Sequence, residues 1–86
     1  MIKVLKFSAV WCGPCRALKP VFDQVRSQIS DVAYQEIDVD SDPSATIKYN
    51  VNSVPTIIIE RGGQEVFRTK GSMTAAALAS IINLNK

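Results

Sequence analysis

The chain has no histidine, one tryptophan and only two cysteines among its 86 residues. Without histidine, a cysteine nucleophile has no imidazole base, which excludes a Cys-His protease mechanism. A structural zinc site needs about four Cys, His or carboxylate ligands, and there is no second cysteine pair to complete one. The two thiols therefore need another explanation.

Long apolar runs and a large net charge are also missing. No apolar run approaches the roughly 20 residues that span a bilayer, and the first residues lack the features of a signal peptide. The net charge is +2 and the basic residues are scattered. This distribution argues against nucleic acid or a membrane as a direct partner. We expect a cytoplasmic protein, in which thiols are kept reduced.

The length fits a single domain, residues 1–86. Its apolar patterns predict a β-α-β-α-β-β-α order, which makes an α/β fold with a four-stranded mixed sheet flanked by three helices on both faces. The predicted elements are strand 2–9, helix 13–29, strand 32–39, helix 44–49, strands 56–59 and 65–69, and a helix after Gly71. Ser72 is the candidate N-cap of this last helix, and Gly62-Gly63 predicts a hairpin turn.

The motif Trp11-Cys12-Gly13-Pro14-Cys15 follows the first strand and opens the first helix. Open α/β sheets usually place their sites at such a strand end. A structural disulfide is a weak alternative, because closing so small a loop stabilises the fold by only about 2 kcal/mol. Two unrelated buried thiols would not need this spacing. A redox-active pair explains more.

The two cysteines of this pair would have different roles. Cys12 lies just before the helix, where unpaired N–H groups and the helix dipole stabilise a thiolate. Cys15 lies one turn later on the same face, and we expect it to be more buried. It can attack a mixed disulfide formed at Cys12. Cys12 is thus the predicted nucleophile and Cys15 the resolving thiol.

The motif, together with Ser53-Val54-Pro55-Thr56, resembles the thioredoxin family. The resemblance covers nearly the whole chain and includes these further segments: Phe7-Ser8-Ala9, Pro20, Asp38-Val39-Asp40, Lys48-Tyr49, Gly62-Gly63 and Gly71. It implies a thioredoxin fold and a protein-disulfide reductase. It also implies regeneration by a thioredoxin reductase, disulfide-containing substrate proteins, a monomer, and no metal or organic cofactor.

The resemblance also implies a substrate-binding surface. Pro55 matches the family's cis-proline, which faces the cysteine pair. Val54 matches the position whose backbone pairs with a bound substrate like a strand. The implied docking surface comprises Trp11, Gly13, Pro14, Val54 and Gly71. For Trp11 the alternative is a core aromatic, although tryptophan is rarely fully buried.

The sequence departs from the family in two respects. It starts with the strand that leads to the cysteines, whereas the usual member has a strand and helix before it, so we expect a minimal, glutaredoxin-sized version. The family's buried aspartate is replaced by Lys6, and a family lysine on the next strand by Glu36. The two charges could pair across neighbouring strands, or Lys6 could extend to solvent. If Lys6 is close, it should lower the cysteine pKa values and make the protein more oxidising.

The predicted function is therefore thiol–disulfide exchange with substrate proteins. One alternative is a glutaredoxin-like enzyme that uses glutathione. However, Gly13-Pro14 stands where a glutaredoxin usually has Pro-Tyr, and the segment after Gly71 lacks the expected acidic pair. The other alternative is a non-catalytic binding subunit of the same fold, in which the cysteines are incidental.

Overall fold

The computed structural model describes all of residues 1–86. Its elements are β1 (Ile2–Ser8), α1 (Gly13–Gln28), β2 (Ala33–Asp38), α2 (Pro43–Lys48), β3 (Thr56–Arg61), β4 (Gln64–Lys70) and α3 (Ala75–Leu84). This is the predicted order, and the boundaries lie within two residues of the expected ones. None of the three helices has the length and hydrophobicity needed to cross a membrane.

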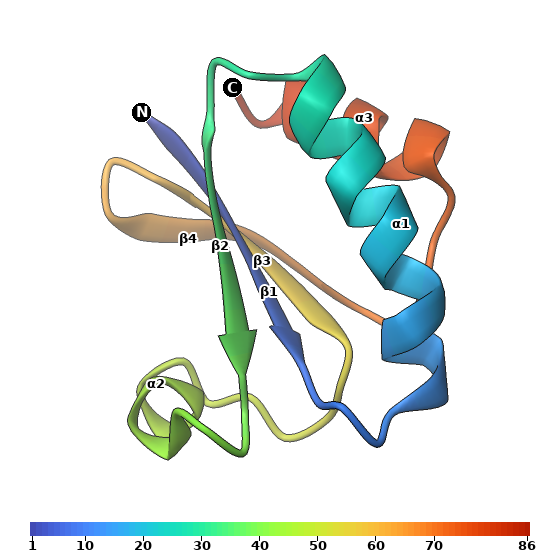
Figure 1. Cartoon of the computed structure of the whole chain (residues 1–86). Helices are drawn as coiled ribbons and strands as arrows, with labels where there is room; N and C mark the ends of the chain where they lie inside the picture. The colour runs from blue at the N-terminus through green and yellow to red at the C-terminus, as the bar shows by residue number, and fades with distance from the viewer.

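The four strands form one mixed sheet in the order β2-β1-β3-β4. β1 pairs with β2 in parallel, and the other two pairings are antiparallel. α1 and α3 lie together on one side of this sheet, and α2 lies near the end of β2 (Figure 1). The predicted fold, a four-stranded mixed sheet with three helices, is confirmed.

β1 divides the core into two parts because its side chains alternate between the faces of the sheet. Ile2 and Val4 pack with α1 and α3. Leu5 and Phe7 pack on the other face, in the cluster that α2 and the segment after it cover. This alternation places Lys6 on the α1 face, where it is buried.

The start of α3 corrects one prediction. Thr74, and not Ser72, is the N-cap, and its side chain accepts a hydrogen bond from the Ala77 N–H at 3.1 Å. Both residue types cap helices well. Met73, between them, packs against the main core. The chain therefore stays extended until Met73 has turned inward, and the helix begins two residues later than expected.

The chain leaves α2 through a tight turn. Asn50 has a positive φ of 53° and donates its N–H to the Ile47 carbonyl, while Val51 donates to the Thr46 carbonyl, both at 3.0 Å. These two bonds define a Schellman motif, whose left-handed position favours glycine or asparagine. The turn directs the chain back toward the sheet and the Val54-Pro55 dipeptide.

Substitution of Asn50 should separate backbone strain from side-chain effects. Asn50→Val should lower the free energy of unfolding by about 1–2 kcal/mol, because a β-branched residue is strained at this φ. Asn50→Gly should change it by no more than about 1 kcal/mol. Urea unfolding of both variants provides the measurement. Equal stability of the two would contradict the assignment of strain to this position.

Candidate active site

Cys12 and Cys15 form a disulfide at the start of α1, with Cα atoms 5.2 Å apart. Cys12 is the N-cap of the helix, and its Sγ accepts the N–H of Cys15 at 3.2 Å. The motif thus places a sulfur atom where helix N–H groups lack backbone partners. When the pair is reduced, this position and the helix dipole favour a thiolate at Cys12.

The two sulfurs differ in their neighbours more than in their exposure. Cys12 is 5% exposed and Cys15 is 4% exposed, so the expected difference in burial is almost absent. Cys12 Sγ lies 3.8 Å from the carbonyl oxygen of Val54. Because the disulfide has no S–H group, this contact is not a hydrogen bond. Cys15 instead lines a cavity on the α1 face.

The segment opposite the cysteines contains the expected cis peptide bond, between Val54 and Pro55. Pro55 is buried, and its carbonyl accepts the N–H of Gly71 at 3.0 Å. Val54 and Gly71 are half-buried, whereas Gly13 and Pro14 are exposed. The structure therefore brings the residues of the predicted docking surface together around Cys12.

Trp11 lies on the surface and not in the core, since it is 65% exposed. Its Nε1–H donates to Asp40 Oδ2 at 2.8 Å. Together with Val54 it borders a cavity of about 230 Å³. Sequence reasoning did not assign Asp40 a role, although its place two residues after β2 put it at the same edge of the sheet as the motif.

Lys6 and Glu36 form an ion pair beneath the motif. Lys6 Nζ lies 2.9 Å from Glu36 Oε1, in the strand register that sets these two residues side by side. The Lys6 side chain is only 3% exposed, so the interpretation that it extends to solvent is wrong. Its ammonium also lies 5.0 Å from the centre of the Phe22 ring, at cation–π distance.

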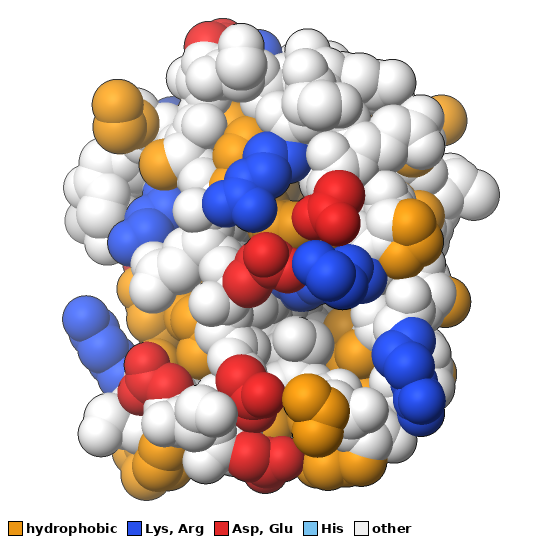
Figure 2. All heavy atoms as spheres, in the orientation of Figure 1, with side chains coloured by type: hydrophobic (Ala, Val, Ile, Leu, Met, Phe, Trp, Pro, Cys, Tyr) orange, Lys and Arg blue, Asp and Glu red, His pale blue; other side chains and the backbone are white.

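Glu36 is the centre of a larger group of charges. Arg26 lies 3.5 Å and Lys19 3.8 Å from its carboxylate oxygens. The hydrogen bond from Lys6 lowers the pKa of Glu36, and partial burial opposes that shift. In the centre of the face shown in Figure 2, positive and negative side chains alternate. The Glu36 charge is thus compensated by cations from both β1 and α1.

The ion pair and Cys15 share one cavity of about 360 Å³. Its lining residues are Lys6, Ser8, Ala9, Val10, Cys15, Arg16, Lys19, Glu36 and Asp38. Arg16 and Lys19 were not singled out from the sequence, although their positions one and four residues after Cys15 placed them near its turn of the helix. The cavity gives Cys15 a charged environment that Cys12 does not share.

Comparison with known proteins shows which family shares this fold. The profile of the thioredoxin family matches residues 1–84. The chain belongs to the thioredoxin family. Thioredoxin-2 of Saccharomyces cerevisiae is 40% identical over 78 residues, which cover 91% of this chain and 75% of the yeast protein. Thioredoxin H2-1 of Oryza sativa is 41% identical over 69 residues, but these cover only 50% of the rice protein.

Solved structures agree with this assignment. The thioredoxin of Fasciola hepatica superimposes with a TM-score of 0.92 at 34% identity, covering 99% of this chain and 81% of that one. The protein is accordingly a thiol–disulfide oxidoreductase with protein-disulfide reductase activity, and Cys12 and Cys15 are its redox-active pair.

Removal of the Glu36 charge should destabilise the protein in a pH-dependent way. Glu36→Gln leaves the buried Lys6 ammonium without its anion, so the free energy of unfolding should fall by about 1–3 kcal/mol at pH 7. Because folding lowers the Glu36 pKa, the stabilisation is full above the pKa of the unfolded chain. It is lost as the pH falls through the folded pKa.

Urea unfolding of wild type and Glu36→Gln between pH 7 and pH 3 tests this expectation, and the difference between them should narrow in acid. Asp23→Asn is the matched control, because Asp23 pairs only with the exposed Lys19 at 3.4 Å. Its effect should stay below about 0.5 kcal/mol. A Glu36→Gln variant as stable as Asp23→Asn at pH 7 would contradict the role of the pair.

Proposed function

We propose that this protein reduces disulfides of substrate proteins, with Cys12 as the nucleophile and Cys15 as the resolving thiol. This assignment rests on the N-cap position of Cys12. Its sulfur accepts the Cys15 N–H and lies next to the Val54 carbonyl. That position favours the thiolate at Cys12. Cys15 is buried beside the cavity on the α1 face and is one helical turn away, which suits a thiol that acts second.

The exchange proceeds in two steps. The Cys12 thiolate attacks one sulfur of the substrate disulfide; a mixed disulfide forms, and the other substrate sulfur leaves as a thiolate that takes up a proton. The Cys15 thiol loses its proton and attacks Cys12 Sγ. The second substrate sulfur then leaves and is protonated. The substrate gains two electrons, and the protein ends as the Cys12–Cys15 disulfide.

The substrate would dock on the apolar rim around Cys12. Exposed Trp11 is held in place by Asp40, and Gly13 and Pro14 are exposed beside it. Val54 would pair its backbone with an extended substrate segment. The adjoining Pro55 and Gly71, joined by a hydrogen bond at 3.0 Å, would support Val54 from below.

The proposed partners are disulfide-containing proteins and a thioredoxin reductase that returns electrons to the pair. We place the protein in the cytoplasm, as a monomer formed by one domain of residues 1–86. Family membership and Gly13-Pro14 between the cysteines favour a reductase over glutathione as the electron source.

Lys6 and Glu36 would set the potential of the cysteine pair. Lys6 is buried on the same cavity as Cys15, and a nearby ammonium stabilises the thiolate form. This favours the reduced protein and makes the pair more oxidising. Glu36 lines the same cavity, and its ion pair with Lys6 would hold the ammonium in place there.

The assignment of the cysteines is tested by two serine variants. Cys15→Ser should accumulate a covalent mixed disulfide between Cys12 and the substrate, because the resolving thiol is missing. Cys12→Ser should form no adduct and lose disulfide reduction altogether. Mass spectrometry after mixing each variant with a disulfide-bonded protein gives the measurement. An adduct at Cys15, or reduction by Cys12→Ser, would reverse the assignment.

The role of Lys6 is tested by exchanging its charge. Lys6→Asp should raise the thiol pKa and make the potential of the pair more negative, by roughly 30 mV for each 1.4 kcal/mol of lost thiolate stabilisation. The double variant Lys6→Asp/Glu36→Lys restores an opposite-charge pair and separates electrostatics from loss of folding. Thiol titration and redox equilibration report both quantities. Unchanged values would mean that Lys6 is not coupled to the sulfurs.

A further inference from the structure

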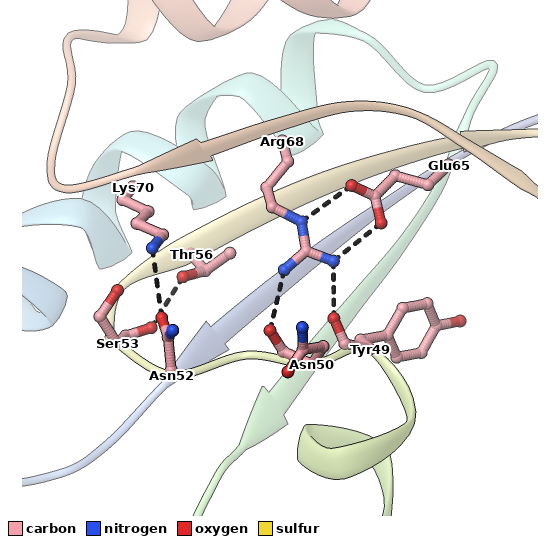
Figure 3. A network of polar contacts seen from close by, with 8 residues as sticks. All are labelled: Tyr49, Asn50, Asn52, Ser53, Thr56, Glu65, Arg68 and Lys70. Carbon is pink, nitrogen blue, oxygen red and sulfur yellow. Dashed lines mark hydrogen bonds and ion pairs between the residues drawn. The ribbon is translucent and has the colours of Figure 1, made fainter.

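Arg68 on β4 connects the sheet to the segment that carries Val54 and Pro55. Its Nη2 donates to the Tyr49 carbonyl at 2.6 Å, and its Nη1 donates to the Asn50 carbonyl at 3.2 Å. The other edge of the guanidinium faces Glu65, with Nε and Nη2 each 2.8 Å from a carboxylate oxygen (Figure 3). One side chain therefore donates hydrogen bonds to the carbonyls of two consecutive residues at the end of α2.

A β-bulge makes this arrangement possible. Ile59 pairs with Phe67, but the next residue of β3, Glu60, pairs with Glu65, so Val66 is an extra residue in β4. In a regular strand, residues 65 and 68 would point to opposite faces. The extra residue shifts the alternation and sets Glu65 on the same side as Arg68.

The geometry requires arginine. Four of its five N–H donors are engaged. The bidentate pairing with Glu65 fixes the plane of the guanidinium, so that its remaining donors point at the two carbonyls. A lysine at this position would supply a single rotatable ammonium and could not hold this planar arrangement.

The two carbonyls that Arg68 binds lie within the Schellman turn at the end of α2. That turn satisfies the carbonyls of Thr46 and Ile47 through backbone N–H groups. Tyr49 is the C-cap of α2 and Asn50 follows it, so their carbonyls lie where acceptors lack intrahelical partners. Arg68 supplies the missing donors from β4. It thereby couples the helix end to β4.

Further contacts continue this attachment along the segment. Lys70, two residues after Arg68, lies with its Nζ 3.2 Å from Asn52 Oδ1, and the Gly71 N–H donates to the Pro55 carbonyl. The Thr56 hydroxyl donates to the Ser53 carbonyl at 2.7 Å. The segment from Tyr49 to Pro55 is thus fixed along its length, with Val54 near its end and next to Cys12.

We propose that the Glu65–Arg68 pair positions the Tyr49–Pro55 segment for substrate docking, so that the Val54 backbone is presented beside Cys12. Arg68 is a positioning residue and touches neither sulfur. This inference rests on the proposed docking of extended substrates at Val54. Loss of the pair would impair recognition of a protein disulfide, which needs the segment. It would spare reaction with a small disulfide, which needs only the thiolate of Cys12.

The experiment compares Arg68→Ala with the matched control Arg61→Ala. Arg61 also donates to a carbonyl, that of Asn85 at 3.1 Å, but it lies at the far end of β3. Each variant is assayed with a disulfide-bonded polypeptide and with dithiobis(nitrobenzoate). For Arg68→Ala we expect KM for the polypeptide to rise about five- to tenfold, as for loss of hydrogen bonds to a charged group. The small-disulfide rate should stay within about twofold of wild type.

Two further variants distinguish positioning from other roles. Arg68→Lys keeps the charge but not the planar donors, so most of the rise in KM should remain. Glu65→Ala should raise KM in the same direction, because it frees the guanidinium plane; if Arg68 contacted substrate directly, Glu65→Ala would leave KM unchanged. Faster amide exchange at residues 51–54 in Arg68→Ala, but not in Arg61→Ala, should accompany these changes. If Arg68→Ala fails to fold, these two variants carry the test.

The possible outcomes are separable. A wild-type protein that reduces neither disulfide would overturn the proposed function. An active wild type with unchanged polypeptide KM in Arg68→Ala would overturn only the positioning role. Equal slowing with both substrates, in proportion to a fall in the urea midpoint, would assign Arg68 a purely structural role and would also overturn the inference.

Discussion

The hydrogen bond from the Cys15 N–H to Cys12 Sγ joins the chemistry of this protein to its fold. It exists because β1 ends just before the point where α1 begins, which makes a cysteine the N-cap of the helix. The apolar face of α1, packed on β1 and β3, fixes the helix axis and so aims its N-terminus at that sulfur. Packing of the core and reactivity of the thiol are therefore set by the same helix.

The second constraint is the buried charge of Lys6. An ammonium in the core is costly unless it is paired, and one carboxylate, Glu36, supplies both the hydrogen bond and the countercharge. Parallel pairing of β1 and β2 sets the two residues side by side. The pair borders the cavity that Cys15 also lines, so a substitution at either position changes the charges on that cavity.

Sequence patterns predicted the element order because apolar periodicity is local, and the motif predicted the site because its residues are contiguous. They failed where a choice depended on packing. Ser72 and Thr74 are both favourable N-cap residues, and the packing of Met73 against the main core decides between them. Whether Lys6 pairs or extends to solvent depends on how thick a layer α1 places over it. The contacts of Arg68 could not be predicted from the sequence, because they require a bulge at Val66 that no local pattern of β4 indicates.

The redox motif occupies one end of the molecule, and both chain ends lie toward the other. The Gly62 N–H donates to the Met1 carbonyl, and Arg61 donates to the Asn85 carbonyl. The hairpin turn and both chain ends are therefore neighbours. α1 starts at the opposite end of the sheet (Figure 1). The redox motif and the two chain ends therefore lie at opposite ends of the sheet. A tether or fused protein joined to either end would leave the cysteines facing outward, as a surface-bound reagent requires.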